Sequence, residues 1–532
     1  MEQRDAGPWR ADLGDGSYRN PVLHADYSDP DAIRVGEDFF LVSSSFSHFP
    51  GLPLLHSRDL VNWRIANHVL PRFEEPGYDR PRHGCGAWAP SLRYHGGFFW
   101  LFFGAPDEGI FMCKAADPFG AWDPPRLVHR ASGWIDPCPF WDEDGRAWLV
   151  HAFARSRCGI KHRLELCPMA PDASALLGEG RTVFEDAERH PTMEGPKLYK
   201  RGPWYYIFAP AGGVKPGWQV VLRSRDLYGP YEDRTVLHQG ATAVNGPHQG
   251  AWVELASGES WFLHFQDKEA YGRVVHLQPM AWEEGWPRIG VDLDGDGIGE
   301  PVAQFRKPVA GAAPLAPASS DGFDGGRLGL QWQWQANPRE EWLSLAERPG
   351  RCRLRAIALP PPAAEAAEGP APVPAGPPTL YEAPNLLLQK FPAPEFRATV
   401  RVELSPDAEG DRAGLAVFGQ RYRYLALGRD GSGAARLSLV EGEAEALPAR
   451  ERELAAVPLG SLGASLRVSV SEGAVCEFSY SAEGGRFAPI GGPFAASPGI
   501  WVGAKVGVFA VNAEGSASAG FADFDDFLVE GP

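Results

Sequence analysis

The sequence predicts an all-β protein, with a five-bladed β-propeller followed by a β-sandwich. Two observations support this: one short pattern recurs five times between residues 20 and 300, and a region of alternating apolar and polar residues follows it. The composition agrees, because 62 Gly and 50 Pro among 532 residues favour short strands joined by turns over long helices. At about 150 residues per domain, the length predicts two or three domains.

Each copy of the repeat has a turn-forming Pro or Gly, a short apolar strand, a polar turn with Gly, and a second strand rich in aromatic residues. The copies begin at Pro30, Pro90, Pro137, Pro196 and Gly250. In several copies a second strand pair follows, in which Ser-Arg-Asp-Leu recurs at 57–60 and 224–227. Two hairpins per unit make the four strands of a propeller blade, whereas β-helix and solenoid repeats are shorter or lack the aromatic second strand.

The second domain begins after an Ala/Pro-rich linker, which predicts a propeller over residues 1–310 and a sandwich over 311–532. Segments 396–404, 464–472 and 505–513 alternate apolar and polar residues. This period predicts two packed antiparallel sheets, as in a concanavalin-like or jelly-roll-like sandwich. The low-complexity stretch 361–378 interrupts the pattern and predicts a surface loop.

Charge and composition exclude several classes of partner. The formal net charge of −17, from 51 Lys+Arg and 68 Asp+Glu, argues against a nucleic-acid-binding surface. The apolar runs are too short to cross a membrane, and the charged N-terminal residues lack a secretory signal, so we expect a cytoplasmic protein. Seven cysteines without a C-x-x-C pair predict reduced thiols. A homo-oligomer is left open.

Titratable residues recur where the first strand of the repeat starts, and this strand lines the central channel of a propeller. Asp29, Asp136 and Glu194 stand just before the repeat's Pro, and Trp88 and His248 take this place in the other two copies. Two facing carboxyl groups can hydrolyse a glycosidic bond, one as the acid and the other ionised, and a third raises the pKa of the acid. Each alone would be an ordinary turn residue, but their matched positions favour a catalytic site.

Several of these segments resemble glycoside hydrolase family 43, which holds β-xylosidases and α-L-arabinofuranosidases built as five-bladed propellers. The stretches are DYSDPDAI, GAWAPS, WIDPCPFW, EGPKLY and GRVVHLQP, and DGFDGGRLGLQWQW resembles the start of the sandwich that follows in many members. The resemblance implies an inverting, exo-acting hydrolase. Its substrates would be xylo-oligosaccharides or arabinose-decorated plant cell-wall oligosaccharides, from which it would release xylose, arabinose or both.

The resemblance also implies roles for individual residues. Asp29 would be the general base that activates water, Glu194 the general acid, and Asp136 the residue that tunes the pKa of the acid. Inversion requires room for a water between base and acid. Arg273 would reach sugar hydroxyls.

Two aromatic residues and a histidine complete the implied site. Phe46 and Trp88 would line the subsite of the terminal sugar. His248 matches a histidine beside a calcium ion on the propeller axis, although calcium prefers oxygen ligands and a neutral histidine bonded to the acid or to water is the alternative. The acidic stretch 292–300 lacks the Glu of a calcium loop at its twelfth position, so an acidic turn is favoured there.

Three other functions are alternatives to this one, and the sequence disfavours the second and third. The protein could be an α-L-arabinofuranosidase with little xylosidase activity. A non-catalytic sugar-binding propeller would lack one of the three carboxylates, and none is missing. A fructan-cleaving hydrolase would open with a Trp-x-Asn-Asp-Pro-Asn signature that is absent here. The sandwich would be a carbohydrate-binding module, or a cap that contributes a residue at the active-site mouth.

Overall fold

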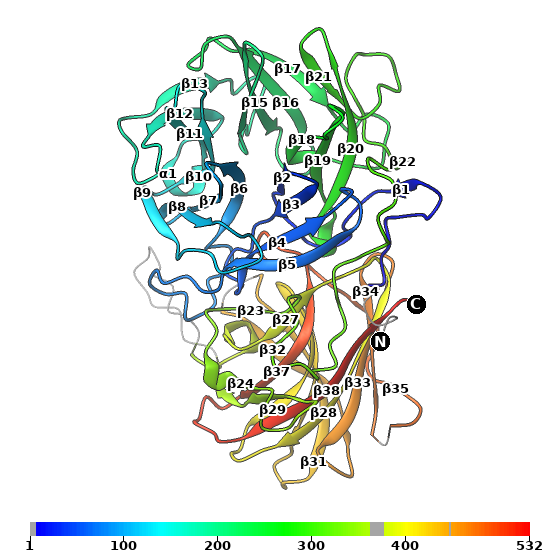
Figure 1. The fold of residues 1–532 in the computed structure, drawn as a ribbon. Coiled ribbons are helices and arrows are strands. Elements are labelled where there is room, and N and C mark those ends of the chain that lie inside the picture. The colour runs from blue at the N-terminus through cyan, green and yellow to red at the C-terminus, as the bar shows by residue number, and fades with distance from the viewer. Residues whose placement is uncertain (1–6, 362–376, 446–447, 483) are drawn as a thin grey trace.

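The computed structural model describes residues 7–361, 377–445, 448–482 and 484–532. It contains a five-bladed β-propeller and a β-sandwich stacked on one another (Figure 1), which confirms the predicted fold class. Most of the predicted surface loop at 361–378, residues 362–376, lies outside the described residues.

Each blade is a four-stranded antiparallel sheet whose strands follow one another in chain order. Blade 1 holds β2 (Asp31–Val35), β3 (Asp38–Val42), β4 (Gly51–Ser57) and β5 (Trp63–Leu70). Blade 2 holds β6 (Trp88–His95), β7 (Phe98–Ala105), β8 (Gly109–Ala115) and β9 (Arg126–Arg130). Blade 3 holds β10 (Trp134–Trp141), β11 (Ala147–Phe153), β12 (Arg163–Met169) and β13 (Arg181–Glu185). Blade 4 holds β14 (Lys197–Arg201), β15 (Trp204–Ala211), β16 (Trp218–Ser224) and β17 (Glu232–Leu237), and blade 5 holds β18 (His248–Glu254), β19 (Ser260–Asp267), β20 (Arg273–Glu283) and β21 (Trp286–Ile289).

The second strand of each blade is apolar on both faces because neighbouring blades cover both faces of the sheet. In β7 every residue after Phe98 is buried. Large aromatic side chains fill the space between blades, and those of Trp63 and Trp261 are fully buried. This packing holds the five inner strands in a fixed arrangement around the axis.

The propeller ring is closed by the N-terminal segment. Leu23 forms an antiparallel bridge with Val275 of blade 5, and β1 (Ser17–Arg19) pairs with β22 (Gln304–Arg306) after blade 5. The chain therefore passes blade 5 before it enters blade 1, which places residues 23–29 against β20.

The sandwich consists of two eight-stranded sheets with an apolar core between them. One sheet contains β23 (Gln333–Trp334), β26 (Ile357–Ala358), β27 (Leu387–Lys390), β29 (Asp411–Phe418), β30 (Arg421–Arg429), β31 (Ala435–Glu443), β32 (Arg450–Pro458) and β37 (Lys505–Asn512). The other contains β24 (Leu343–Ser344), β25 (Cys352–Arg355), β28 (Phe396–Ser405), β33 (Gly463–Ser471), β34 (Val475–Ser481), β35 (Ala488–Pro489), β36 (Phe494–Ala495) and β38 (Phe521–Glu530). In β28 and β33 buried residues alternate with more exposed ones, as the sequence pattern predicts.

Helical segments are short: α1 (Arg155–Cys158), η1 (Glu269–Tyr271), η2 (Glu340–Trp342) and η3 (Leu380–Glu382). Among the residues that the structure describes, none of the helices has the length and apolar character needed to span a bilayer.

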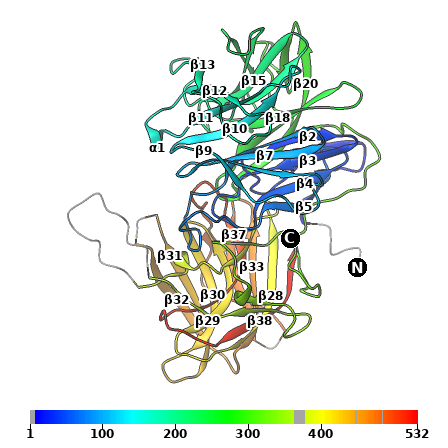
Figure 2. The same ribbon diagram turned by 60° about the vertical axis from the view of Figure 1, so that its left-hand side comes forward.

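The two domains share an extended interface, with the sandwich sheets standing beneath the propeller (Figure 2). The backbones of Phe49 and Trp334 exchange two hydrogen bonds. A sandwich loop before β37 also reaches the propeller, since the Ala504 N–H donates to the carbonyl of Ala270 at 2.7 Å. This loop borders the candidate active site.

Candidate active site

Near the start of the inner strand of every blade lies a residue in the left-handed backbone region. These residues directly precede the repeat's Pro or Gly, and their φ values are 54° for Asp29, 31° for Ala89, 56° for Asp136, 59° for Gly195 and 32° for Gln249. In blades 2, 3 and 5 the strand register also shifts at this point. A bulge of this kind bends the strand and redirects its side chains, and such strain concentrates at functional sites.

The structure refines the predicted equivalence of the five repeat positions. Asp29 and Asp136 share the left-handed position, but Trp88, Glu194 and His248 stand one residue earlier, followed by Ala89, Gly195 and Gln249. At the Glu194 position a glycine follows because its φ of 59° suits a residue without Cβ. The carboxylates therefore come from two successive positions of the bulge.

Six of the seven predicted site residues line one pocket at the axis. The pocket holds about 420 Å³ of empty space, including its open mouth. It is lined by Asp29, Phe46, Trp88, Ala89, Ile135, Asp136, Glu194, Val214, Gln249, Arg273 and Trp501. Small, partly enclosed pockets with a few converging polar groups are typical of ligand sites. The seventh residue, His248, lies behind Glu194.

Asp29 is held by two donors. The Arg273 guanidinium donates from Nη1 to Oδ1 at 2.8 Å, and the Ser44 hydroxyl donates to Oδ2 at 2.6 Å. Ser44 Oγ in turn accepts the N–H of Ala89 at 2.7 Å, which ties blade 1 to blade 2. The Asp29 and Arg273 side chains are 7% and 9% exposed, so this pair is almost completely desolvated. Each carboxylate oxygen keeps a further lone pair that could accept a proton.

Asp136 is buried and carries a raised pKa. Burial is the main cause and the negative charge of Asp29 adds to it, while the Gly195 N–H opposes both by donating to Oδ2 at 2.7 Å. The Gln249 amide also donates to Oδ2, at 3.2 Å. Asp136 is therefore fixed in orientation by donors from blades 4 and 5, and its pKa is shifted so that the protonated form is favoured.

Glu194 has the chemistry of an acid. Burial, followed by the charge of Asp136, raises the pKa of Glu194, and Arg273 acts in the opposite direction. Its side chain remains 22% exposed, so it can reach a ligand in the pocket. A carboxyl group that stays protonated near neutral pH can donate a proton to a leaving group.

His248 lies against Glu194, with Nε2 3.5 Å from Oε1. Burial, and then the charge of Arg273, lowers the pKa of His248 to about 3, so the ring is neutral. Neither of its ring nitrogens has a hydrogen-bond partner in the described structure. One imidazole and one carboxylate fall well short of the six to eight oxygen ligands that calcium takes, so the protein groups here do not by themselves fit a calcium site. Calcium binding near His248 stays a prediction, and the chemistry derived below does not use it.

A second set of acidic residues belongs to the acidic turn at 292–300. Within the described part of the chain, His238, Asp294 and Asp296 bring ligand atoms within 4.8 Å of one another. Asp294 and Asp296 also accept backbone N–H groups of their own loop. These bonds are those of an acidic turn, and the group is outside the axial pocket.

Further buried charges join the inner strands of the blades outside the pocket. Lys197 donates to the carbonyl of Pro90 at 2.9 Å and to the Ser91 hydroxyl at 2.7 Å. Arg93 donates to Asp31 at 2.8 Å. The charge of Lys197 acts against the raised pKa of Asp136. These bonds connect the inner strands of blades 1, 2 and 4, and none of the four side chains lines the pocket.

Aromatic side chains form the pocket wall. The rings of Phe46 and Trp88 meet edge to face at 5.8 Å, and those of Trp88 and Trp501 at 6.0 Å. Arg273 lies 5.8 Å from the Trp501 ring. Phe46 is almost fully buried, whereas Trp501 is 48% exposed and offers ring surface to a ligand.

Trp501 and Gln249 are pocket residues that sequence reasoning missed. Trp501 comes from the sandwich loop before β37 and is the residue that a capping sandwich would contribute at the mouth. Its sequence signal is weak, an aromatic residue after Pro-Gly and before a strand. Gln249 could have been found, because it takes the same repeat position as Asp29 and Asp136.

The sequence of this chain matches two models of known protein families. The family model described as "Glycosyl hydrolases family 43" matches residues 18–287. The chain belongs to this family. A second model, "Beta xylosidase C-terminal Concanavalin A-like domain", matches residues 320–530. Both parts of the resemblance that the sequence motifs indicated are therefore confirmed.

Curated relatives and solved structures extend over nearly the whole chain. A protein of Xylanibacter ruminicola named "Putative beta-xylosidase" is 41% identical over 513 residues, covering 94% of this chain and 88% of the relative. A "Beta-xylosidase" of Formosa agariphila is 32% identical and covers 100% of this chain and 93% of the relative. The crystal structure of a xylan beta-1,4-xylosidase from Bacillus halodurans superposes with a TM-score of 0.83 at 25% identity, over 96% of this chain and 99% of the other.

Proposed function

We propose that this family 43 glycoside hydrolase releases single xylose or arabinose residues from the ends of xylo-oligosaccharides or arabinose-decorated oligosaccharides, with inversion at the anomeric carbon. The observation that carries the proposal is the set of three carboxyl groups in one small pocket, of which Glu194 and Asp136 have raised pKa values. The names of the relatives support the sugar, since they include β-xylosidases and a "Non-reducing end alpha-L-arabinofuranosidase" of Bacteroides ovatus that is 30% identical over 438 residues, covering 77% of this chain and 76% of the relative.

In the proposed reaction, the Glu194 carboxylic acid donates its proton to the glycosidic oxygen as the bond from that oxygen to the anomeric carbon breaks. A water attacks the anomeric carbon from the opposite face, and Asp29 takes the proton that the water loses. The products are one free sugar of inverted configuration and an oligosaccharide that is one residue shorter. Arg273 holds Asp29 in place, and Asp136 keeps Glu194 protonated.

The shape of the pocket supports exo action. Trp88 and Trp501 meet at its wall, so one side of the site is closed by an element from the sandwich. A pocket that is closed on one side suits a terminal sugar better than the middle of a long chain. The rest of the substrate would extend from the mouth.

The test compares wild type with Glu194→Gln on xylobiose and on p-nitrophenyl β-xyloside. Proton donation matters less when the leaving group is already acidic, so the variant should lose about 100-fold or more on xylobiose and much less on the nitrophenyl substrate. Equal losses on both would contradict the acid role. Nuclear magnetic resonance of the first product anomer tests inversion, and retention would exclude this mechanism.

The alternative is an α-L-arabinofuranosidase with little xylosidase activity, which the Bacteroides ovatus relative favours. Parallel kinetics on p-nitrophenyl α-L-arabinofuranoside and β-xyloside separate the two. A ratio of kcat/KM above about 100 in favour of the arabinoside, equal to a difference of nearly 3 kcal/mol in transition-state binding, would select the alternative.

A further inference from the structure

A buried carboxylate behind the pocket connects its own chain segment to two distant ones, so that three segments meet there. Asp26 is 3% exposed. Its Oδ1 accepts the backbone N–H of Arg273 at 3.0 Å and the Ser28 hydroxyl at 2.9 Å. Its Oδ2 accepts the backbone N–H of Gly503 at 3.0 Å.

Each of these segments carries a residue of the candidate active site. Ser28 precedes Asp29, Arg273 itself bonds Asp29, and Gly503 follows Trp501 by two residues. Two segments belong to the propeller and the third to the sandwich. The side chain of Asp26 does not line the pocket, so it touches the site through these backbone and hydroxyl contacts. Burial acts to lower the pKa of Arg273, and the charge of Asp26 adds to that of Asp29 in raising it.

The sandwich places two buried lysines toward Asp26, and burial lowers the pKa of both, with the charge of Lys390 helping to bring that of Lys505 to about 7. Lys390 of β27 and Lys505 of β37 stand directly opposite each other in the antiparallel pair. Like charges at such positions repel, and burial makes this more costly. Burial alone would raise the pKa of Asp26, but Lys390 and Lys505, followed by the backbone donors, bring it below the ordinary value. The Asp26 charge therefore offsets a repulsion inside the other domain.

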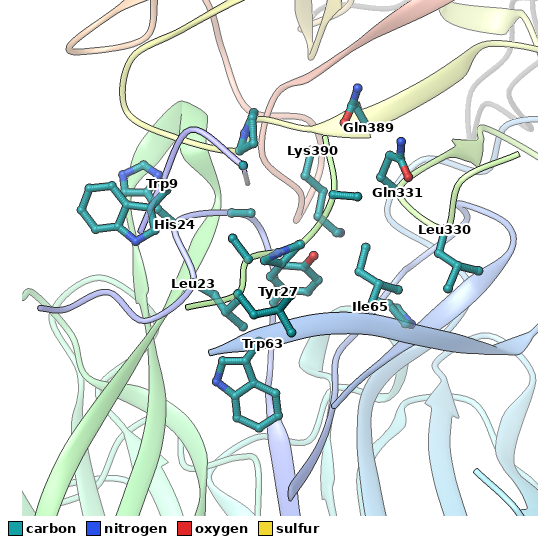
Figure 3. A pocket seen from close by; sticks show the side chains of 18 of the residues that line it. Trp9, Leu23, His24, Tyr27, Trp63, Ile65, Leu330, Gln331, Gln389 and Lys390 are labelled. Atoms are coloured by element: carbon teal, nitrogen blue, oxygen red, sulfur yellow. The ribbon is translucent and has the colours of Figure 1, made fainter. Parts of the chain in front are cut away.

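The close-up of the cavity between the domains shows one of these lysines, Lys390, beside Tyr27 (Figure 3). Lys390 points from the sandwich toward Tyr27, whose ring its ammonium group approaches to 5.2 Å. Tyr27 is the neighbour of Asp26 and is fully buried. The lysine is thus directed at the segment that carries Asp26.

The two domains also approach too closely here for side chains. A Cβ on Gly503 would come within 2.7 Å of the Gly272 nitrogen, and a Cβ on Gly272 within 2.5 Å of Asp26 Oδ1. Both glycines are therefore required for the Asp26 carboxylate to reach Gly503. This close contact between Gly503, Gly272 and Asp26 restricts the conformations that the loop carrying Trp501 can adopt. We call it the Asp26 joint.

We infer that Asp26 is a positioning residue that joins the sandwich loop carrying Trp501 to the propeller segments carrying Arg273 and Asp29, so that the pocket is complete only when the two domains are docked. The expected changes in kcat and KM rest on the proposed function, whereas the expected change in the position of the loop rests on the fold alone.

The experiment is a double-mutant cycle with Asp26→Asn and Trp501→Ala, measured as kcat/KM on p-nitrophenyl β-xyloside and α-L-arabinofuranoside. An asparagine amide cannot accept both backbone N–H groups, so one segment is released. We expect Asp26→Asn to lower kcat/KM about tenfold, mainly through KM, in the wild-type background, and less than about threefold when Trp501 is already Ala. Equal factors in both backgrounds would overturn the inference.

Asp411→Asn is the matched control. Asp411 is also 3% exposed and its Oδ2 accepts the backbone N–H groups of Asp407 and Ala408, but it lies in β29, outside the pocket lining. This variant should lose stability without a change in KM. Gly503→Ala, which breaks the same joint without removing a charge, should raise KM as Asp26→Asn does. A rise in KM with Asp411→Asn, or none with Gly503→Ala, would count against the inference.

Hydrogen exchange separates this inference from the proposed function, because it needs no turnover. Asp26→Asn should speed amide exchange in residues 499–504 at least about tenfold, and Asp411→Asn should leave those residues unchanged. If the amides of residues 499–504 exchange no faster in Asp26→Asn than in the wild type, the positioning role of Asp26 is refuted even when the enzyme is active. If hydrolysis is absent from the wild type but exchange changes as expected, the proposed function fails and the joint stands.

Discussion

Removing the positive partner of Asp29 should destabilise the protein more than removing both partners. Arg273 Nη1 lies 2.8 Å from Asp29 Oδ1, and both side chains are over nine-tenths buried. At an effective dielectric constant of about 20, charges at this separation attract by about 6 kcal/mol. The cost of desolvating two ions offsets most of this gain in the wild type, so the net contribution of the pair is small.

Arg273→Met breaks the pair but leaves the Asp29 charge buried. We expect the free energy of unfolding to fall by about 3–5 kcal/mol. The double variant Asp29→Asn/Arg273→Met carries neither charge and should recover most of that loss. Urea unfolding at pH 7, followed by tryptophan fluorescence, measures all four members of the cycle.

The reasoning would be refuted by either of two results: a loss below about 1 kcal/mol in Arg273→Met, or a double variant as unstable as the sum of the single ones. Hydrolysis should fall strongly in every variant of the cycle, since Asp29 and Arg273 both line the pocket. Activity therefore cannot substitute for the stability measurement.

Three further changes test other parts of the site. Asp136→Asn removes the negative charge that, after burial, raises the pKa of Glu194. The alkaline limb of the plot of kcat against pH should therefore move to lower pH by about 1 unit. An unmoved limb would show that Asp136 does not tune the pKa of the acid. Trp501→Ala should raise KM about tenfold and change the free energy of unfolding by less than about 1 kcal/mol, because its ring is 48% exposed; an unchanged KM would remove it from the site. Gly195→Ala forces a Cβ within 2.6 Å of Gln249 Cγ at a φ of 59°. We expect kcat to fall, and the free energy of unfolding to fall by about 1–2 kcal/mol in thermal unfolding. A neutral effect would contradict the tight packing behind Asp136.

The propeller was predictable because its information is repeated. Each inner strand and aromatic second strand recurs, so weak local patterns support one another across five copies. Alignment of the repeats also identified Asp29 and Asp136 as candidate site residues. The one-residue offset of Glu194 can be read from the sequence, since Glu194 stands two residues before Pro196 whereas Asp29 and Asp136 directly precede their prolines. The left-handed backbone at the bulge was not predictable, because Ala89 and Gln249 take this conformation against their intrinsic preference.

The pocket mouth could not be predicted from the sequence for a different reason. Trp501 belongs to a loop without a repeat, and it reaches the site only because Gly503 packs against Gly272 across the domain interface. Asp26 was equally hidden, since an aspartate three residues before Asp29 has no local signal of burial. Contacts between distant segments, rather than local preference, decide both positions.

The division of the site between two domains has a consequence for specificity. The charged groups stand on bulged inner strands that neighbouring blades hold rigidly, so substitutions there disturb the carboxylates themselves. The wall at the mouth depends on the loop 498–502, whose Ile500 already packs against Gly84 and whose Trp501 faces Trp88. Changes within this loop alter the shape of the mouth while leaving the Asp29–Arg273 pair and the environment of Glu194 in place. Preference between xylosides and arabinosides can therefore change through the sandwich without a change in the catalytic groups, provided that Asp26 keeps the loop docked.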